Sequence, residues 1–264
     1  MNNDQPRWTE IEHLPEWDEE FYHVYTAKKF GKWVMLKTLR PEYKDSPEMQ
    51  AMLEKEFDIR YNLCHPNIVM INDFEEVPGI GRCIITDDVY GDSLRKLLKE
   101  GKVTEAHIEK LSHNLVDALE YIQNNHLAHH PLTPENIIFT ENIGNLKLID
   151  VGFDQRKCLS HGDTSQDIYN YGMVIKEVLD TTGIDNPRLR RVAERCTDAN
   201  PDRRPRDTQS LRMALAGRRP NTFYIAVAAF LAGMVALMVY LSLTDHPRYN
   251  SQKATEPQAI EQSK

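Results

Sequence analysis

Residues 220–244 contain no Asp, Glu, Lys or Arg, and this uncharged run constrains the fold more than any other feature of the chain. Its central part, 222–244, reads TFYIAVAAFLAGMVALMVYLSLT. As a helix it would measure about 34 Å at about 1.5 Å per residue, enough for a hydrocarbon layer of roughly 30 Å. Tyr224 and Tyr240 stand where interfacial aromatic residues are found. A helix that is apolar all round is typical of a membrane span, so the sequence predicts a transmembrane helix at 222–244.

The basic residues on the two flanks predict the orientation of this helix. Six arginines precede it and three basic residues follow it: Arg203, Arg204, Arg206, Arg212, Arg218 and Arg219 against Arg248, Lys253 and Lys264. Cytoplasmic flanks carry the excess of positive charge, so we expect a single-pass protein of the cell membrane with its N-terminal part in the cytoplasm. Residues 245–264 are short and polar, and we expect a disordered tail outside the cytoplasm.

Composition limits what the N-terminal part can be. It is long enough for one two-lobed domain, and charged residues at 27% of the chain are typical of a folded protein. The net charge of −8 argues against nucleic acid as a partner. The four cysteines lie far apart, which predicts reduced thiols with no disulfide framework and no zinc site.

The N-terminal segment has no apolar core, so we do not expect a signal peptide there. We expect residues 1–16 to form a leader ahead of a domain over 17–216.

Periodicity within 17–216 predicts an α+β fold in two lobes. Residues 21–37 form two β-rich runs around Gly31, which predicts a hairpin, and two further apolar runs surround 77–81. Ser46 and Pro47 are a typical helix start, and the following residues have helical spacing. After residue 104 the pattern is helical. We therefore expect a small β-rich lobe with one main helix at about 17–86 and a larger helical lobe at about 91–216.

Several short motifs occur in a fixed order along this domain. They are VMLK at 34–37, Glu56 on the following helix, HPNIV at 65–69, TDDVYGDSL at 86–94, HHPLTPEN at 129–136, Asp150-Val151-Gly152, DIYNYGMVIKEVL at 167–179 and CTDANPDRRP at 196–205. Together they resemble the protein-kinase family, of the eukaryotic-like Ser/Thr type found in bacteria.

The resemblance implies a nucleotide site between the lobes. Lys37 and Glu56 would form the ion pair that holds the phosphates, and Asn136 and Asp150 stand at the two Mg²⁺ positions. The other residues implied at this site are Met35 at its roof, with Thr86 and Asp87 at the hinge. ATP and Mg²⁺ are therefore the implied ligands, bound weakly if at all, because the chain departs from the family pattern.

The departures remove groups that phosphoryl transfer needs. Pro131 stands in place of the catalytic Asp and offers no proton acceptor. Residues 17–23 replace the glycine loop and contain no glycine, so two carboxylates of this segment would face the nucleotide instead. Thr133 stands where these kinases have a Lys. Met35, in place of the usual Ala, adds bulk to the adenine slot.

Two further departures concern structure around the site. Arg60, one turn after Glu56, falls at a position that is apolar in active kinases, and a buried Arg there needs a partner. The segment 153–166 lacks the Ala-Pro-Glu motif of the substrate platform. Arg204 should therefore lack the Glu with which it pairs in the family.

Three interpretations follow from this pattern. The first is a membrane-tethered pseudokinase that acts on protein partners in a signalling complex, as a scaffold or allosteric regulator. The second is a weak or unconventional ATP-dependent Ser/Thr protein kinase. The third is a nucleotide-binding switch without phosphotransfer. Loss of the base, the glycine loop, the phosphate Lys and the substrate platform favours the first.

Overall fold

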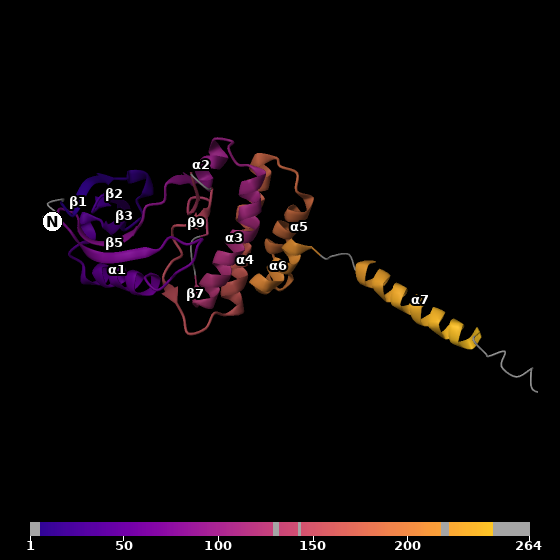
Figure 1. Ribbon diagram of the computed structural model, residues 1–264. Helices are drawn as coiled ribbons and strands as arrows, with labels where there is room; N and C mark the ends of the chain where they lie inside the picture. Colours follow the sequence, from indigo (N-terminus) through magenta and orange to yellow (C-terminus); the bar gives the residue numbers. More distant parts are fainter. Residues whose placement is uncertain (1–5, 129–131, 142–143, 218–221, 245–264) are drawn as a thin grey trace, which may run out of the picture. The chain divides into compact units, whose positions relative to one another are not determined.

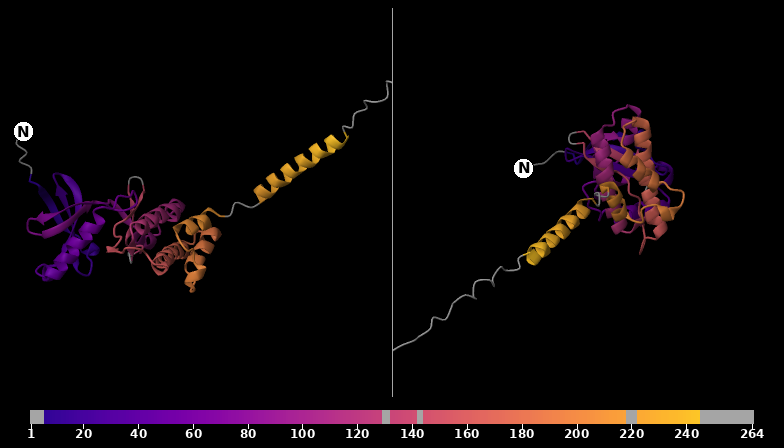
Figure 2. Two further views of the ribbon diagram at one scale, coloured as in Figure 1. Left: turned by 90° about the horizontal axis from the view of Figure 1, so that it is seen from below. Right: turned by 90° about the vertical axis from the view of Figure 1, so that its right-hand side faces the viewer.

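The computed structural model describes residues 6–128, 132–141, 144–217 and 222–244 (Figure 1). The chain divides into two units, Met1–Ala216 and Gly217–Lys264. The first unit has the two-lobed α+β architecture that the sequence predicts, with a β-rich small lobe and a mostly helical large lobe (Figure 2).

The small lobe is built on one antiparallel sheet of five strands in the order β1-β2-β3-β5-β4. The strands are β1 (Trp8–His13), β2 (Tyr22–Lys29), β3 (Lys32–Leu39), β4 (Ile71–Val77) and β5 (Gly81–Asp87). The hairpin predicted at Gly31 is confirmed. Phe30 and Gly31 have φ values of 51° and 81°, the two positive values that a tight two-residue turn between twisted strands requires. Gly79, with φ 78°, lies in the second predicted hairpin.

Helix α1 (Pro47–Arg60) packs on one face of this sheet. Ser46 is its N-cap, since the Ser46 side chain accepts a hydrogen bond from the Met49 amide at 3.4 Å. Leu53 is fully buried in the cluster that joins the helix to the sheet. The polar residues Glu56 and Arg60 of α1, one turn apart, are also buried.

The sequence does not predict strand β1, which lies in the segment expected to be a leader. It pairs with β2 at the sheet edge, with an irregular register between Thr9 and Glu12. Glu10 has a φ of 52° within that irregularity. The strand is exposed or half-buried along its length, so it lacks the alternation of apolar and polar residues that identifies a strand from sequence.

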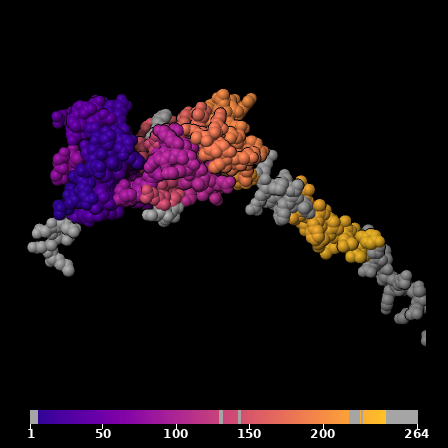
Figure 3. Space-filling view, turned by 90° about the horizontal axis from the view of Figure 1, so that it is seen from above, coloured from indigo at the N-terminus to yellow at the C-terminus, as the bar shows by residue number. Residues whose placement is uncertain are grey.

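The large lobe, which Figure 3 draws in magenta to orange, is mostly helical (Figure 1). Its helices are α2 (Leu94–Lys99), α3 (Glu105–Asn124), α4 (His161–Thr182), α5 (Pro187–Cys196) and α6 (Thr208–Ala216). Its short strands are β6 (Gly91–Ser93), β7 (Leu127–Ala128), β8 (Ile137–Thr140), β9 (Leu146–Leu148) and β10 (Asp154–Gln155), which pair as β6-β8-β9 and β10-β7. Short 3-10 turns at Pro15–Trp17, Pro41–Tyr43 and Pro201–Arg203 complete the unit. The predicted apolar face of α3 is confirmed, since Ile108, Leu111, Leu115, Leu119 and Ile122 are all buried.

The HPNIV segment connects the two lobes through backbone hydrogen bonds. The Leu148 amide donates to the Asn67 carbonyl at 2.8 Å, and the Val69 amide donates to the Leu148 carbonyl at 2.8 Å. The buried Asn67 side chain adds a bond from Nδ2 to the Leu146 carbonyl at 2.9 Å. These bonds hold the residues before β4 against β9, and so fix the strand end that leads to Asp150.

The second unit contains the described helix α7 (Thr222–Thr244). Its side chains are described at Ile225 and over 227–242, and these are exposed. Within that described part of the chain, no helix combines the length and the apolar character needed to cross a membrane. The membrane-spanning prediction is therefore not confirmed by the structure.

Candidate nucleotide-binding site

A cavity of about 610 Å³ lies between the lobes. It is lined by most residues that the sequence placed at a nucleotide site: Met35, Lys37, Thr86, Asp87, Asn136 and Asp150. Met35 and Thr86 face each other on the paired strands β3 and β5. Glu56 lies behind the lining, with none of its side chain exposed to solvent.

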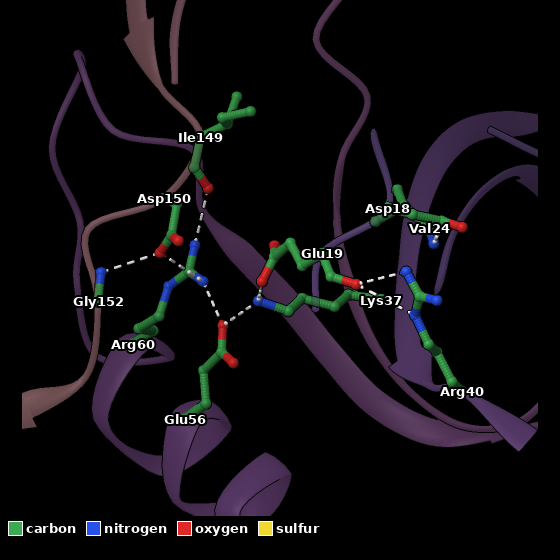
Figure 4. A network of polar contacts seen from close by, with 10 residues as sticks. All are labelled: Asp18, Glu19, Val24, Lys37, Arg40, Glu56, Arg60, Ile149, Asp150 and Gly152. Carbon is green, nitrogen blue, oxygen red and sulfur yellow. Dashed lines mark hydrogen bonds and ion pairs between the residues drawn. The ribbon is translucent and has the colours of Figure 1, made fainter. Parts of the chain in front are cut away.

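Lys37 forms the ion pair expected with Glu56 and a second one that the sequence did not predict. Its Nζ donates to Glu56 Oε1 at 3.1 Å and to Glu19 Oε2 at 2.8 Å (Figure 4). The same Nζ lies 4.3 Å from the centre of the buried Tyr22 ring. Burial lowers the pKa of Lys37, but the neighbouring Glu56 and Glu19 carboxylates outweigh it and raise the pKa above its usual value. The ammonium is therefore fully charged and already has two carboxylate partners.

Arg60 has the partners that its burial requires, and they include Asp150. Its guanidinium donates to Glu56 through Nη1 and to the Ile149 carbonyl through Nη2, the latter at 2.9 Å. Nη1 also lies 3.5 Å from Asp150 Oδ1, as Figure 4 shows. Asp150 Oδ1 in turn accepts the Gly152 amide at 2.9 Å. Burial raises the pKa of Asp150, but Arg60 and Lys37 outweigh it and hold the pKa below its usual value.

The segment in place of a glycine loop is fixed to the sheet. The Asp18 carboxylate accepts the Val24 amide at 3.0 Å. The Glu19 carbonyl accepts two bonds from Arg40, at 2.9 and 3.1 Å. Glu19 and Tyr22 also exchange backbone hydrogen bonds at 3.1 and 3.4 Å, which closes a tight turn. These contacts direct the Glu19 carboxylate at Lys37 (Figure 4). Burial raises the pKa of Glu19 although Lys37 opposes it.

The described cavity lining is strongly acidic. Seven carboxylates and two cations line it: Glu16, Asp18, Glu19, Asp87, Asp88, Glu135 and Asp150 against Lys37 and Arg60. The cations already contact carboxylates, so little positive charge is left for a polyphosphate. Such a lining repels an anionic ligand, an effect that is strongest where the groups are shielded from water.

The catalytic loop is described only in part. Pro131, with His129 and His130, lies outside the described residues. Asn136 lines the cavity, and its backbone carbonyl accepts the Ile149 amide at 3.1 Å. Thr133 is exposed.

The segment after Asp150 is short because α4 begins early. Ser160 caps α4, so the sequence 161–166 belongs to its first turns. Arg204 donates to the Asp198 carbonyl at 2.9 Å and to the Ser165 carbonyl at 3.3 Å, and lies 4.6 Å from the Tyr169 ring centre. Arg204 also donates to the Ser165 hydroxyl at 3.4 Å, so its contacts in the described residues are with carbonyl and hydroxyl oxygens and an aromatic ring.

Glu56→Ala tests how far the fold depends on the buried carboxylate. The variant leaves Lys37 and Arg60 without their shared partner, and a buried ion pair that loses one member costs about 3–5 kcal/mol. Glu54→Ala is the control, because Glu54 lies on the same helix and forms an exposed pair with Arg82 that contributes at most about 1 kcal/mol. The measurement is urea unfolding of both variants at pH 7. Equal losses for the two would contradict this role of Glu56.

Comparison with known proteins gives the family. The model of the protein kinase domain matches residues 20–187, more than half of the chain. Serine/threonine-protein kinase 36 of Pongo abelii is 31% identical over 135 residues, which cover 50% of this chain and 10% of that protein. Serine/threonine-protein kinase PknD of Mycobacterium tuberculosis is 31% identical over 154 residues, covering 56% of this chain and 23% of that protein. The chain thus spans a quarter or less of the length of these relatives.

Solved structures agree on the fold. The crystal structure of the Mycobacterium tuberculosis PknI kinase domain matches with a TM-score of 0.58 at 18% identity, covering 80% of this chain and 95% of that one. At that identity the match concerns the fold alone. With the family match over residues 20–187 and the two-lobed architecture, the chain belongs to the protein kinase family.

Proposed function

We propose that this chain is a catalytically inactive member of the family, a pseudokinase that acts by binding protein partners in a signalling complex as a scaffold or allosteric regulator. The observation that carries the proposal is that Lys37 and Asp150 are both occupied by charged side chains of the chain itself. Catalysis of phosphoryl transfer depends on positioning and on charge stabilisation, for which these two residues are central.

The Glu19 carboxylate takes the place of a phosphate group at Lys37. It lies 2.8 Å from Nζ, within the range of a charge-assisted hydrogen bond. A nucleotide would have to displace it and then share the cavity with it. The Glu19 side chain is 41% exposed, so displacement into water is sterically open, but its charge would stay close to the phosphates.

The guanidinium of Arg60 opposes a metal ion at Asp150. A cation 3.5 Å from Oδ1 neutralises the carboxylate that would hold Mg²⁺ and repels a second positive charge. The loss of the proton acceptor at Pro131 and of the phosphate Lys at Thr133 is independent support from sequence.

A nucleotide-binding switch is the second candidate, and the size of the cavity favours it. A volume of about 610 Å³ falls within the range of roughly 300–1,000 Å³ for small-molecule sites. The half-buried Met35 and Thr86 could contact a base even if the phosphate end is blocked. A weak Ser/Thr kinase remains the third candidate, supported by the names of the relatives.

Nucleotide affinity separates these candidates. For the pseudokinase we expect ATP to bind more weakly than about 0.1 mM, which corresponds to less than roughly 5.5 kcal/mol. Glu19→Gln should tighten ATP binding by about tenfold or more, because it removes a negative charge from the phosphate end. Isothermal titration calorimetry of the full chain, with and without Mg²⁺, is the measurement.

Glu20→Gln is the matched control for this titration. It makes the same charge change at the neighbouring exposed residue, so ATP affinity should not change. Micromolar ATP binding by the wild-type chain, lost in Lys37→Met, would replace the pseudokinase proposal with the nucleotide switch.

Phosphotransfer is expected to be undetectable. Loss of a positioned base alone costs about 10²–10⁴-fold in rate, and Pro131→Asp should not restore activity while the glycine loop and phosphate Lys are absent. The measurement is transfer of labelled phosphate from Mg-ATP to the chain itself and to generic protein substrates. Robust transfer by the wild-type chain that Asp150→Asn abolishes would show that it is a kinase.

We also propose that residues 222–244 anchor the protein in the cell membrane, with the kinase-like domain on the cytoplasmic side. The support is the uncharged apolar sequence and the excess of arginine before it. The full chain should then stay in the membrane pellet after carbonate extraction, whereas a chain that ends at Ala216 should be released. Release of the full chain would refute the anchor.

A further inference from the structure

Two imidazoles and one carboxylate come together on the small lobe, outside the ion-pair network around Lys37. His13 is the last residue of β1, His23 is the second residue of β2, and Asp18 lies in the turn between these strands. His13 pairs with Tyr25 in the sheet register, two residues beyond His23. This register brings the rings together, with the His13 and His23 centroids 4.6 Å apart.

The donor atoms face one another. His13 Nε2 lies 3.0 and 3.1 Å from the two Asp18 carboxylate oxygens, and His23 Nδ1 lies 2.8 Å from Oδ2. One ligand atom from each residue lies within 4.8 Å of the other two. The Asp18 side chain is also fixed by the Val24 amide, which donates to Oδ1.

These separations suit a small tetrahedral metal ion. Ligands about 2.0–2.1 Å from zinc lie about 3.3 Å from one another along the edges of the tetrahedron. Both nitrogen-to-oxygen separations are within about half an ångström of that edge. The ligand nitrogens of His13 and His23 lie within 4.8 Å of each other, so the partly exposed imidazole rings would have to move closer together when an ion binds.

The donor types also select the class of ion. Imidazole nitrogen with a single carboxylate is typical of Zn²⁺ and neighbouring transition metals. Mg²⁺ and Ca²⁺ instead prefer a shell of oxygen ligands. The cysteine spacing predicts no zinc site, but a site built from His13, Asp18 and His23 contains no cysteine and could not be indicated by that spacing.

We propose that His13 Nε2, His23 Nδ1 and one oxygen of Asp18 form a three-ligand site for a divalent cation of the Zn²⁺ class, with water at the fourth position. The side chains of His13 and His23 are 35% and 21% exposed, so an ion can enter from solvent. These three ligands are proposed from their own geometry and not from the proposed function of the cleft, although Asp18 also lines the cavity.

The position of the site gives it a structural role. Asp18 directly precedes Glu19, whose carboxylate contacts Lys37. A metal ion on Asp18 would join the ends of β1 and β2 to this turn. It would therefore hold Glu19 in the place where it excludes a phosphate.

Zinc titration of the full chain tests the proposal. The protein carries no polyhistidine tag, is first treated with a chelator, and is titrated with Zn²⁺ in competition with a chromophoric indicator. We expect one Zn²⁺ per chain with micromolar or tighter affinity, and visible absorption of a tetrahedral Co²⁺ complex when Co²⁺ replaces it. Mg²⁺ at the same concentrations should not compete.

The variants distinguish a built site from adventitious binding. His13→Ala, His23→Ala and Asp18→Asn should each weaken Zn²⁺ binding at least about tenfold, in line with losses of 10–100-fold for lesser changes around metal sites. His113→Ala is the control, since His113 is exposed on α3, and it should bind as the wild type does. Circular dichroism of each metal-free variant shows whether it is folded. Asp18→Asn should disturb the fold least, because its side-chain oxygen can still accept the hydrogen bond from the Val24 amide.

Zn²⁺ affinity that is equal in the wild type and in Asp18→Asn would overturn the proposal, and so would the absence of a tetrahedral Co²⁺ spectrum. In that case the three residues form only a hydrogen-bonded cluster.

Discussion

The buried carboxylate of Glu56 is the constraint on which the arrangement of the cleft depends. It has no exposed surface and its Oε1 contacts two cations, Lys37 and Arg60. Among the described residues, its second oxygen has no hydrogen-bond partner, so the buried charge of Glu56 is compensated through Oε1 by these two cations. Each cation then reaches a further acid, Glu19 from the small lobe and Asp150 from the large lobe. The cleft is thereby held together by its own charges.

A kinase cleft uses the same carboxylate differently. There the Lys–Glu pair leaves the ammonium free to contact phosphates, and the Asp is free for Mg²⁺. Here the partners of Lys37 and Asp150 have the charge signs of the phosphate and of the metal ion, respectively. Glu19 thus lies where a phosphate would contact Lys37, and Arg60 lies where a metal ion would contact Asp150. Under the proposed pseudokinase function, these internal contacts give Lys37 and Asp150 charged partners in the absence of Mg-ATP.

Much of the fold follows from local sequence patterns. The turn at Gly31, the cap at Ser46 and the apolar face of α3 each depend on a few neighbouring residues, so the sequence predicts them. The Lys37–Glu56 pair could be predicted because the family resemblance supplies its long-range geometry. Strand β1 could not, since it is half-exposed and irregular.

The site contacts of Arg60, Glu19 and His13 could not be predicted from the sequence for a different reason. The need of Arg60 for a partner was evident from burial, but its acceptor at Ile149 lies 89 positions away. The contact of Glu19 with Lys37 depends on how Arg40 and Asp18 fix the turn. The approach of His13 to His23 depends on the register of an edge strand that the sequence did not reveal. Such contacts between distant residues require the three-dimensional structure.

The early start of α4 has a consequence for how this protein could change. The resemblance to active kinases implies that residues 161–166 form part of a substrate platform. In this chain they form the first turns of α4, which Ser160 caps. Asp163 and Ser165 are buried there, and Arg156 is paired with Asp163. A longer segment could be accommodated only by inserting residues, since unwinding these turns would expose buried groups. Point substitutions in the cleft could recover charges and side chains, but not the missing length of chain. Under the proposed inactive function, activity would therefore require an insertion in this segment in addition to substitutions in the cleft.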